Sequence, residues 1–210
     1  MRRWILALAA AALLMPVEAN DHLDNLLERA SQQLNRAEFL EEPRALEEAR
    51  AAIDAALKLT PEHFSALRLR VRQLAIAGDL PAARELALAL NKQMPDDLEV
   101  RWWLVYACRR MKRTEEAERA AQWMLDLRPE DPRSLLAAVD LRIDAGQFES
   151  ALRVCLDLLV RAEVGDAYLR LAVLDRTAAA YTGLERAELA GKARAAAAQL
   201  RVQVKGRKPE

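Results

Sequence analysis

The sequence predicts an all-α fold, a right-handed α-solenoid of about five helical hairpins, and three observations support this prediction. The chain of 210 residues is dominated by Ala, Leu, Arg and Glu and holds only 6 Gly, a composition that favours helices. Apolar residues recur at helical spacing, as at Leu67, Val71 and Leu74, which indicates amphipathic helices. Several residue types also repeat every 34 positions, a period typical of stacked helical hairpins.

The repeat is marked by residues that recur at equivalent positions of successive hairpins. They are Pro61, Pro95 and Pro129; Ala49, Ala83, Ala117 and Ala151; and Val71, Val105, Val139 and Val173. The alanines end a motif that we expect to open the second helix of each hairpin: LEEA (46–49), LPAA (80–83), TEEA (114–117), FESA (148–151) and LERA (184–187). Gly78 and Gly146 lie two periods apart, and Gly78-Asp79 is expected to form the turn between two helices.

This motif and its period resemble those of tetratricopeptide repeat (TPR) proteins over about residues 24–200. The resemblance implies hairpins whose first helices line a concave surface and whose second helices cover the back. It also implies that each motif alanine lies where two helices cross closely, so that a larger side chain would push them apart. The LERA step comes 36 residues after FESA, which predicts two extra residues around 181–183. Such a repeat scaffold carries many unrelated tasks, so the resemblance names no partner.

The N-terminus has the pattern of a secretory signal peptide over residues 1–19. Arg2 and Arg3 precede an apolar run from Trp4 to Met15, and Val17-Glu18-Ala19 offers small residues to a signal peptidase. An uncleaved membrane anchor is the alternative, but twelve helical residues would span only ~18 Å of a ~30 Å bilayer core. We therefore expect a periplasmic chain that starts at Asn20 and has no stable membrane insertion after cleavage.

The remaining chain is expected to form one TPR-like α-solenoid domain over residues 20–203, followed by a disordered basic tail over residues 204–210. The last helix, at about 184–203, is rich in Ala and charged residues. That composition suits an end cap that faces water.

A candidate binding surface follows if the repeated valines point inward. Residues three before and one after each valine then face the concave groove, which places Trp102 and Tyr106 there together, while Trp103 is expected to pack between repeats. The predicted partner-binding residues are Arg68, Arg72, Trp102, Tyr106, Arg109 and Arg170. Arg can grip a carboxylate through two hydrogen bonds, and Trp and Tyr often dominate binding energy. The expected ligand is an acidic segment or a free C-terminus with a bulky apolar residue. Packing of the aromatic pair and solvation of the arginines are the structural alternatives.

Other chemistry is sparse. Cys108 and Cys155 are expected to be buried and unpaired, because they fall on helices that are diagonal neighbours. His22 and His63 lack ligand spacing, so no metal site is expected. No glycine-rich phosphate loop or nucleophile–His–acid grouping points to a cofactor or an enzyme. The 32 basic and 32 acidic residues give no argument for nucleic acid. Carboxylates such as Glu116 are expected on exposed helical faces.

The function predicted from these features is a protein-interaction scaffold or assembly factor of the bacterial cell envelope, with a protein or peptide partner in the concave groove. Two alternatives remain open. One is a module that binds an acidic exported polysaccharide, with Trp102 and Tyr106 as stacking platforms. The other is a structural spacer in an envelope secretion complex, with the convex face as the contact.

Overall fold

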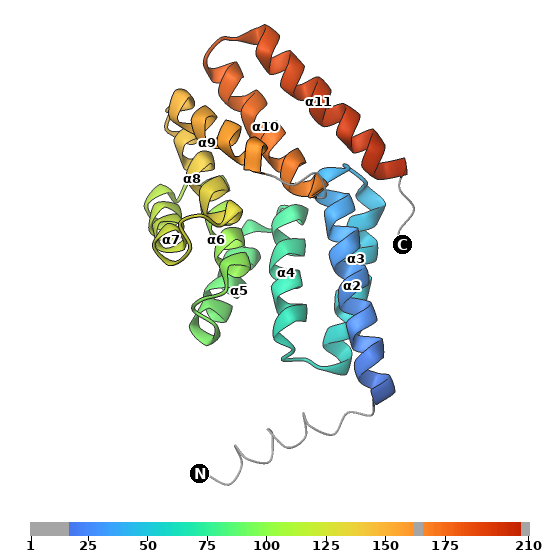
Figure 1. Ribbon diagram of the computed structural model, residues 1–210. Coiled ribbons are helices and arrows are strands. Elements are labelled where there is room, and N and C mark those ends of the chain that lie inside the picture. Colours follow the sequence, from blue (N-terminus) through green and yellow to red (C-terminus); the bar gives the residue numbers. More distant parts are fainter. Residues whose placement is uncertain (1–16, 162–165, 207–210) are drawn as a thin grey trace.

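The computed structural model describes residues 17–161 and 166–206, so most of the predicted signal peptide lies outside the described residues. Within these residues the chain forms ten helices that follow one another as hairpins (Figure 1). They are α2 (Val17–Phe39), α3 (Pro43–Leu59), α4 (Phe64–Ala77), α5 (Leu80–Gln93), α6 (Leu98–Arg110), α7 (Thr114–Leu127), α8 (Pro132–Asp144), α9 (Phe148–Arg161), α10 (Ala167–Gly183) and α11 (Ala187–Gly206). The predicted all-α solenoid of helical hairpins is confirmed.

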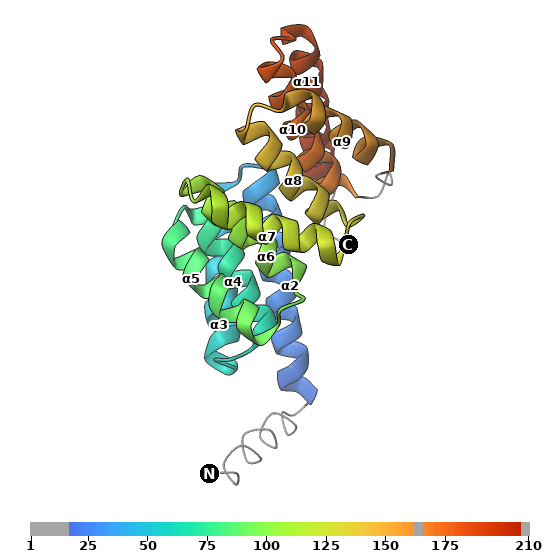
Figure 2. The same ribbon diagram turned by 90° about the vertical axis from the view of Figure 1, so that its left-hand side faces the viewer.

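Each helix packs against the next one in the chain, and each first helix also packs against the first helix of the following hairpin. The first helices are α2, α4, α6, α8 and α10, and the second helices are α3, α5, α7, α9 and α11. Seen from the side, the α8–α11 hairpins stack above the hairpins of α2 to α7 (Figure 2). The first helices therefore form a continuous series along the inside of the stack.

The repeated residues occupy the positions that the period predicts. Ala83 and Ala117 are fully buried, and Val71 and Val105 are at most 1% exposed. The corresponding alanines and valines of the other hairpins, up to Ala151 and Val173, are buried as well. Pro61, Pro95 and Pro129 each lie two residues beyond the end of a second helix. The sequence period thus identifies both the core and the hairpin boundaries.

The last hairpin differs from the prediction. Helix α10 has 17 residues where α8 has 13, which is about one additional helical turn. The second helix consequently begins at Ala187, which is exposed, and Ala190 is the buried motif alanine. The motif of this hairpin is therefore AELA (187–190), and the LERA assignment was wrong because the extra residues extend a helix instead of a loop.

Helix α11 also runs beyond residue 203, where the basic tail was expected to start. It continues to Gly206, and its side chains Leu200 and Val204 pack against the buried Leu40. These apolar residues lie four apart on one helical face, so their burial stabilises the last turns of the helix. The start of the predicted tail is therefore structured, and residues 207–210 lie outside the described residues.

A second correction concerns Glu116, which was expected on a solvated face. Its carboxylate accepts hydrogen bonds from Nε and Nη2 of Arg84 at 3.0 and 2.7 Å, and its side chain is only 20% exposed. Arg84 is on α5 and Glu116 on α7. The pair thus joins two second helices on the back of the stack.

The turns inside the hairpins require a left-handed residue. Gly78 and Gly146 adopt φ values of 86° and 72°, and Lys112, halfway between them in the repeat, adopts φ 59°. Left-handed backbone costs an L-residue about 1–2 kcal/mol, whereas Gly has no such penalty. Lys112 therefore holds a conformation that the second and fourth hairpins give to glycine.

We expect Lys112→Gly to raise the free energy of unfolding by about 0.5–1 kcal/mol, since the gain in the turn exceeds the added flexibility of the unfolded chain. Gly146→Ala is the matched control with the opposite sign. A Cβ at Gly146 would meet no atom within 4 Å, so only the backbone penalty applies. Urea unfolding of both variants measures the difference. A destabilised Lys112→Gly variant would contradict the turn assignment.

The last hairpin returns to the first helix, because α10 contacts α2. Leu40, which is 2% exposed, packs against the fully buried Leu171 and Ala197. The rings of Phe39 and Tyr168 lie 5.4 Å apart. Nε of Arg201 donates to the backbone oxygen of Phe39 at 3.0 Å, and Nη2 donates to Asp175. We call this contact the seam; its residues are Phe39, Leu40, Tyr168, Leu171, Asp175, Ala197 and Arg201.

Candidate partner-binding site

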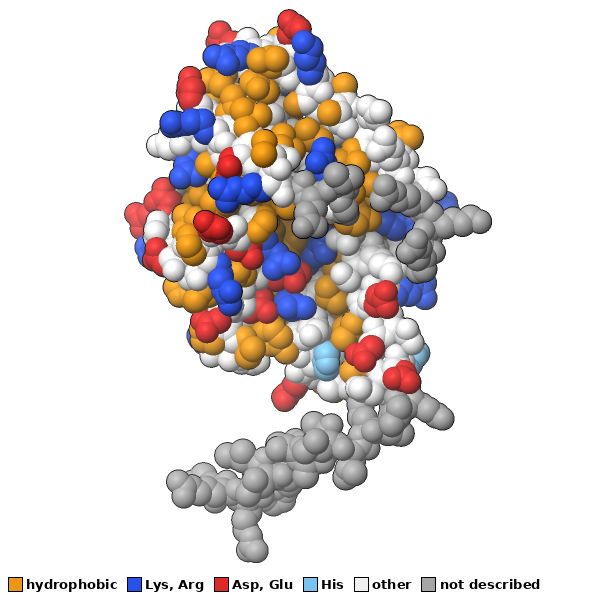
Figure 3. Space-filling view, viewed as in Figure 1, with side chains coloured by type: hydrophobic (Ala, Val, Ile, Leu, Met, Phe, Trp, Pro, Cys, Tyr) orange, Lys and Arg blue, Asp and Glu red, His pale blue; other side chains and the backbone are white. Residues whose placement is uncertain are grey.

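A funnel of about 330 Å³ opens at the centre of the concave side, and every first helix contributes to it. Its lining residues are Asn35, Glu38, Phe39, Arg72, Glu99, Trp102, Trp103, Asp131, Pro132, Arg133, Leu136, Asp166, Tyr168, Leu169, Ala172 and Arg176. Figure 3 shows a hollow near the middle of this face, with basic, acidic and apolar side chains around it. The funnel is thus the place where all five hairpins can touch one ligand.

Two of the six predicted residues line the funnel, namely Arg72 and Trp102. Trp103, expected to pack between repeats, is 4% exposed and reaches the funnel as well. The other four predicted residues, Arg68, Tyr106, Arg109 and Arg170, do not line it. The structure therefore brings together only part of the predicted surface.

Three of the predicted arginines are already paired with carboxylates of the chain. Nε and Nη2 of Arg72 donate to Glu38 at 3.1 and 2.7 Å. Arg68 forms an ion pair with Asp97 at 3.3 Å. Arg109 contacts two carboxylates of α8, one at 2.9 Å and the other at 2.7 Å. The charge of each of these arginines is therefore neutralised within the fold.

The remaining two predicted residues lie apart from the funnel. The ring of Tyr106 packs edge-on against Trp103 at 5.5 Å, and its hydroxyl accepts a hydrogen bond from Arg110 at 3.3 Å. Arg170 is half-buried on α10, and no carboxylate of the described residues forms an ion pair with it. Trp102 and Tyr106 consequently do not form a joint aromatic platform.

Asp140 holds three first helices together beneath the funnel. Its carboxylate accepts from Nε and Nη2 of Arg176 at 2.9 and 2.8 Å, and its Oδ2 lies 2.9 Å from Nη1 of Arg109. The Asp140 side chain is 9% exposed. Burial would lower the pKa of Arg176, but Asp140 outweighs it, so the pKa of the guanidinium is raised. This network joins α6, α8 and α10.

Glu38 plays the corresponding part on the other side of the funnel. It pairs with Arg72 and so joins α2 to α4. Burial raises the pKa of the Glu38 carboxyl, and the neighbouring Arg72 guanidinium opposes this shift. Glu38, Arg72, Tyr106 and Asp140 are each 34 residues apart. The same repeat position therefore carries an acid, a base, an aromatic residue and an acid in turn.

The two tryptophans of the funnel are held in place by arginines. The guanidinium of Arg176 lies 5.4 Å from the ring centre of Trp102, and that of Arg72 lies 5.7 Å from the ring centre of Trp103. Such cation–π contacts contribute ~0.5–2 kcal/mol each. The rings of Trp102 and Trp103 meet edge-on at 79°. The aromatic wall is therefore rigid before any ligand arrives.

The parts of the funnel left for a ligand are mainly apolar. Phe39, Leu136, Tyr168 and Leu169 line it beside Trp102. Asp131 and Asp166 also reach the funnel, where they cap the first turns of α8 and α10 by accepting from backbone N–H groups at 2.8 and 2.9 Å. Arg133 at the same edge is exposed. The edge thus carries both signs of charge, and the interior offers apolar surface.

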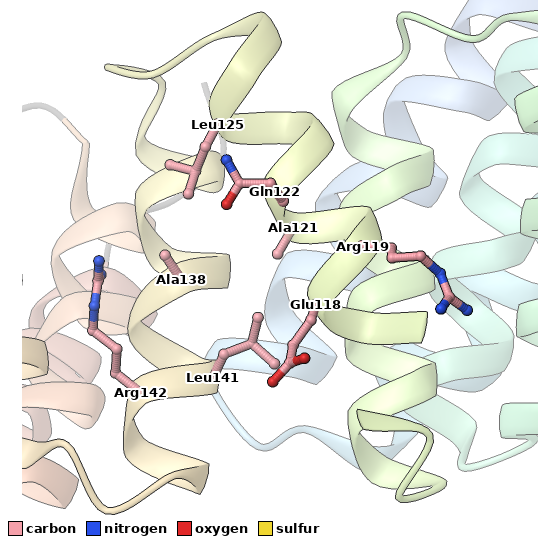
Figure 4. Close-up of a pocket in the computed structure, with 8 residues that line it drawn as sticks. All are labelled: Glu118, Arg119, Ala121, Gln122, Leu125, Ala138, Leu141 and Arg142. Atoms are coloured by element: carbon pink, nitrogen blue, oxygen red, sulfur yellow. The ribbon is translucent and has the colours of Figure 1, made fainter. Parts of the chain in front are cut away.

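A second hollow of about 450 Å³ lies on the back between α7 and α8 (Figure 4). Its apolar lining consists of Ala121, Leu125, Ala138 and Leu141. The side chain of Arg119 points away from it. Although its volume is larger, only two helices form this hollow, and no aromatic residue lines it. The funnel is the stronger candidate because it combines aromatic walls with several helices.

The remaining side chains add no further chemistry to the site. Cys108 and Cys155 are buried and unpaired, and burial raises the pKa of each thiol to about 11. Both thiols are therefore protonated near neutral pH. Among residues 17–161 and 166–206, no three His, Cys, Asp or Glu side chains are arranged to hold a metal ion, and no helix has the length and apolarity to cross a membrane.

No protein-family model matches the chain, and the curated proteins gave no significant match. Solved structures that are similar to this chain include the following two. One of them is a tetratricopeptide repeat protein from Parabacteroides merdae, 15% identical, with 86% of this chain and 73% of that chain covered at a TM-score of 0.49. The other is YrrB, described as a TPR protein with an unusual peptide-binding site, 17% identical, with coverages of 82% and 90% and a TM-score of 0.45.

Sequence reasoning missed four residues that shape the candidate site of this helical solenoid: Glu38, Phe39, Tyr168 and Arg176. Glu38 could have been found, because it precedes Arg72 by one period. Arg176 lies one period after Arg142, at a helix position that the predicted groove did not include. Phe39 and Tyr168 lack any periodic signal, because they meet only when the last hairpin returns to the first.

Proposed function

We propose that the protein is a peptide-binding scaffold that holds an apolar side chain of a partner in the funnel. The observation that carries this proposal is the half-buried Trp102, held by Arg176 in a funnel to which every first helix contributes. The funnel volume of about 330 Å³ lies at the lower end of the ~300–1,000 Å³ typical of ligand pockets. A rigid aromatic wall is the kind of surface that anchors a partner's side chain.

The paired arginines change the expected chemistry of the ligand. An acidic segment was predicted because Arg68, Arg72 and Arg109 were thought to be free to bind carboxylates. Each now has a carboxylate within 3.3 Å, so binding an acidic ligand would have to break an ion pair. We therefore propose an uncharged apolar residue as the anchor, with flanking polar groups that meet Asp131 and Arg133 at the edge.

The polysaccharide alternative receives no support from the aromatic geometry. A stacking platform needs flat rings side by side, whereas Tyr106 does not line the funnel and Trp102 meets Trp103 edge-on at 79°. The spacer alternative depends on the back of the stack and is decided by the experiment below.

The test selects peptides from a random phage-displayed library on the purified protein and measures the affinity of the synthetic peptides by calorimetry. Trp102→Ala is expected to weaken their binding by about 2 kcal/mol or more, roughly thirtyfold in Kd. Trp123→Ala is the matched control, because Trp123 is also half-buried but lies on α7 outside the funnel. Circular dichroism establishes that both variants are folded.

A second control separates the proposed ligand from an acidic one. Arg68→Ala is expected to leave the affinity unchanged at low and high salt, because Arg68 lies outside the funnel and pairs with Asp97. An acidic ligand held by Arg68 would bind less tightly to this variant, most of all at low salt. If Trp102→Ala has no effect while changes at Leu125 on the back abolish binding, the spacer function is favoured instead.

We also propose that the protein acts in the bacterial cell envelope. The support comes from the charged, apolar and small-residue segments of residues 1–19. Leu23, four residues after the proposed cleavage site, is buried at 3% exposure, so cleavage before Asn20 would leave the packed residues in place. Mass spectrometry of the N-terminus from periplasmic extracts is expected to find Asn20 first. A cytoplasmic chain that retains Met1 would rule out this location.

A further inference from the structure

Two residues belong both to the seam and to the funnel. Phe39 of α2 and Tyr168 of α10 contact each other across the seam at 5.4 Å and also line the funnel. One wall of the funnel is therefore made by the meeting of the first hairpin with the last one. If these hairpins separated, this wall would be lost.

The seam differs from the other junctions between neighbouring first helices. Ion pairs join α2 to α4 (Glu38–Arg72), α4 to α6 (Arg68–Asp97), α6 to α8 (Arg109–Asp140) and α8 to α10 (Asp140–Arg176). Among the described residues, no ion pair joins α10 directly to α2. The series of ion pairs is thus continuous along the chain and ends on both sides of the seam, where Glu38 of α2 and Arg176 of α10 interact only at longer range.

Within the described residues, the seam is closed by apolar packing and one hydrogen bond, without an ion pair. Leu40 packs in a buried apolar cluster with Leu171 and Ala197, and Arg201 donates to the backbone oxygen of Phe39. The ion pair of Arg201 with Asp175 lies within the last hairpin and does not itself join the seam. A repeat stack is stabilised mainly between chain neighbours, whereas the seam joins hairpins that are distant in the chain. The seam can therefore open while each hairpin stays folded.

We propose that the seam is a gate on the funnel: it opens to admit a partner segment and closes around it. This inference rests on the proposed function, since a ligand in the funnel touches Phe39 and Tyr168 and so favours the closed seam. Seam closure and binding are then coupled, and each strengthens the other. Arg201 and Leu40 act as positioning residues, because neither lines the funnel.

The gate can be tested without a ligand by acrylamide quenching of tryptophan fluorescence. The full-length chain carries Trp4→Phe and Trp123→Phe, so that the remaining signal comes from Trp102 and Trp103 in the funnel. Leu40→Ala and Arg201→Ala are expected to raise the quenching constant at least about twofold by opening the seam. Hydrogen exchange is expected to rise in the C-terminal half of α2 and in α10 and α11, but not in α5 to α7.

Two controls remove similar contacts away from the seam. Ile53→Ala removes a fully buried aliphatic side chain from a core cluster that contains neither tryptophan. Arg84→Ala removes an arginine on the back that donates through both Nε and Nη2. Neither is expected to change the quenching of Trp102 and Trp103. Equal quenching and equal exchange in seam variants and controls would overturn the gate.

The same variants separate the gate from the proposed function. A synthetic peptide from the phage selection is expected to bind the seam variants at least about tenfold more weakly and to slow exchange of α10 in the native chain. If Trp102→Ala weakens peptide binding but the seam variants bind the peptide as tightly as the native chain does, the gate is wrong and the binding function stands. If quenching responds to the seam but no peptide is selected, the gate stands and the peptide-binding function fails.

Discussion

Asp140→Ala is expected to lower the free energy of unfolding by about 3–5 kcal/mol, because it leaves two guanidinium groups without their buried carboxylate. Asp140 is 9% exposed at its side chain and contacts both Arg109 and Arg176. Arg176 stacks on Trp102 and would keep its charge in a poorly solvated position. The loss of one carboxylate thus disturbs three first helices at once.

Removal of Arg176 is expected to be less damaging than removal of Asp140. In Arg176→Met the apolar part of the side chain remains, and Asp140 still has Arg109 as a partner at 2.9 Å. Urea unfolding gives both values. Glu188→Ala is the control, since Glu188 is 80% exposed and pairs only with Lys192 on the same helix; this change is expected to cost less than ~0.5 kcal/mol. Equal losses for Asp140→Ala and Glu188→Ala would show that the network does not stabilise the fold.

Ala117→Leu is expected to destabilise the protein by about 1–3 kcal/mol through overpacking. Ala117 is fully buried on α7, where the second helix of the hairpin meets α6. A leucine there has no space unless the helices move apart. The thermal midpoint should fall with the free energy of unfolding, and calorimetry measures both.

The control for Ala117→Leu must be an exposed residue of the same turn. Glu115→Ala meets this requirement because Glu115 is 90% exposed, and the change is expected to alter stability by less than ~0.5 kcal/mol. Glu116→Ala is unsuitable, because it would remove the partner of Arg84. If Ala117→Leu and Glu115→Ala unfold at the same temperature, the close crossing at Ala117 is wrong.

The fold could be predicted from the sequence because the same residue types recur wherever two helices cross and wherever a helix ends. Ala83, Ala117 and Ala151 mark the helix crossings, and Pro61 and Pro95 mark the ends of second helices. These residues act locally, and each hairpin packs its two helices in the same way. The helical hairpins can therefore be predicted from the 34-residue period.

The candidate site could be predicted only in part. The period placed Arg72 and Trp102 on the concave side, and both line the funnel, but the period carries no information about which carboxylate a side chain meets. Pairs such as Arg109–Asp140 depend on the distance between successive hairpins. The sequence period does not give that distance. Arg176 lies three residues beyond Val173, at a helix position that the predicted groove did not include. Contacts across the seam could not be predicted either, because they depend on how the last hairpin is placed relative to the first.

The seam also bears on how the chain folds. An open repeat array can unravel from its two ends, one hairpin at a time. Here the hydrogen bond from Arg201 to Phe39 joins residues 162 positions apart, whereas the hairpins form from close neighbours in the chain. Because such a long loop must be closed against chain entropy, the join is expected to form last. Once made, it joins the two terminal hairpins, so neither can fray from its end until the seam has opened.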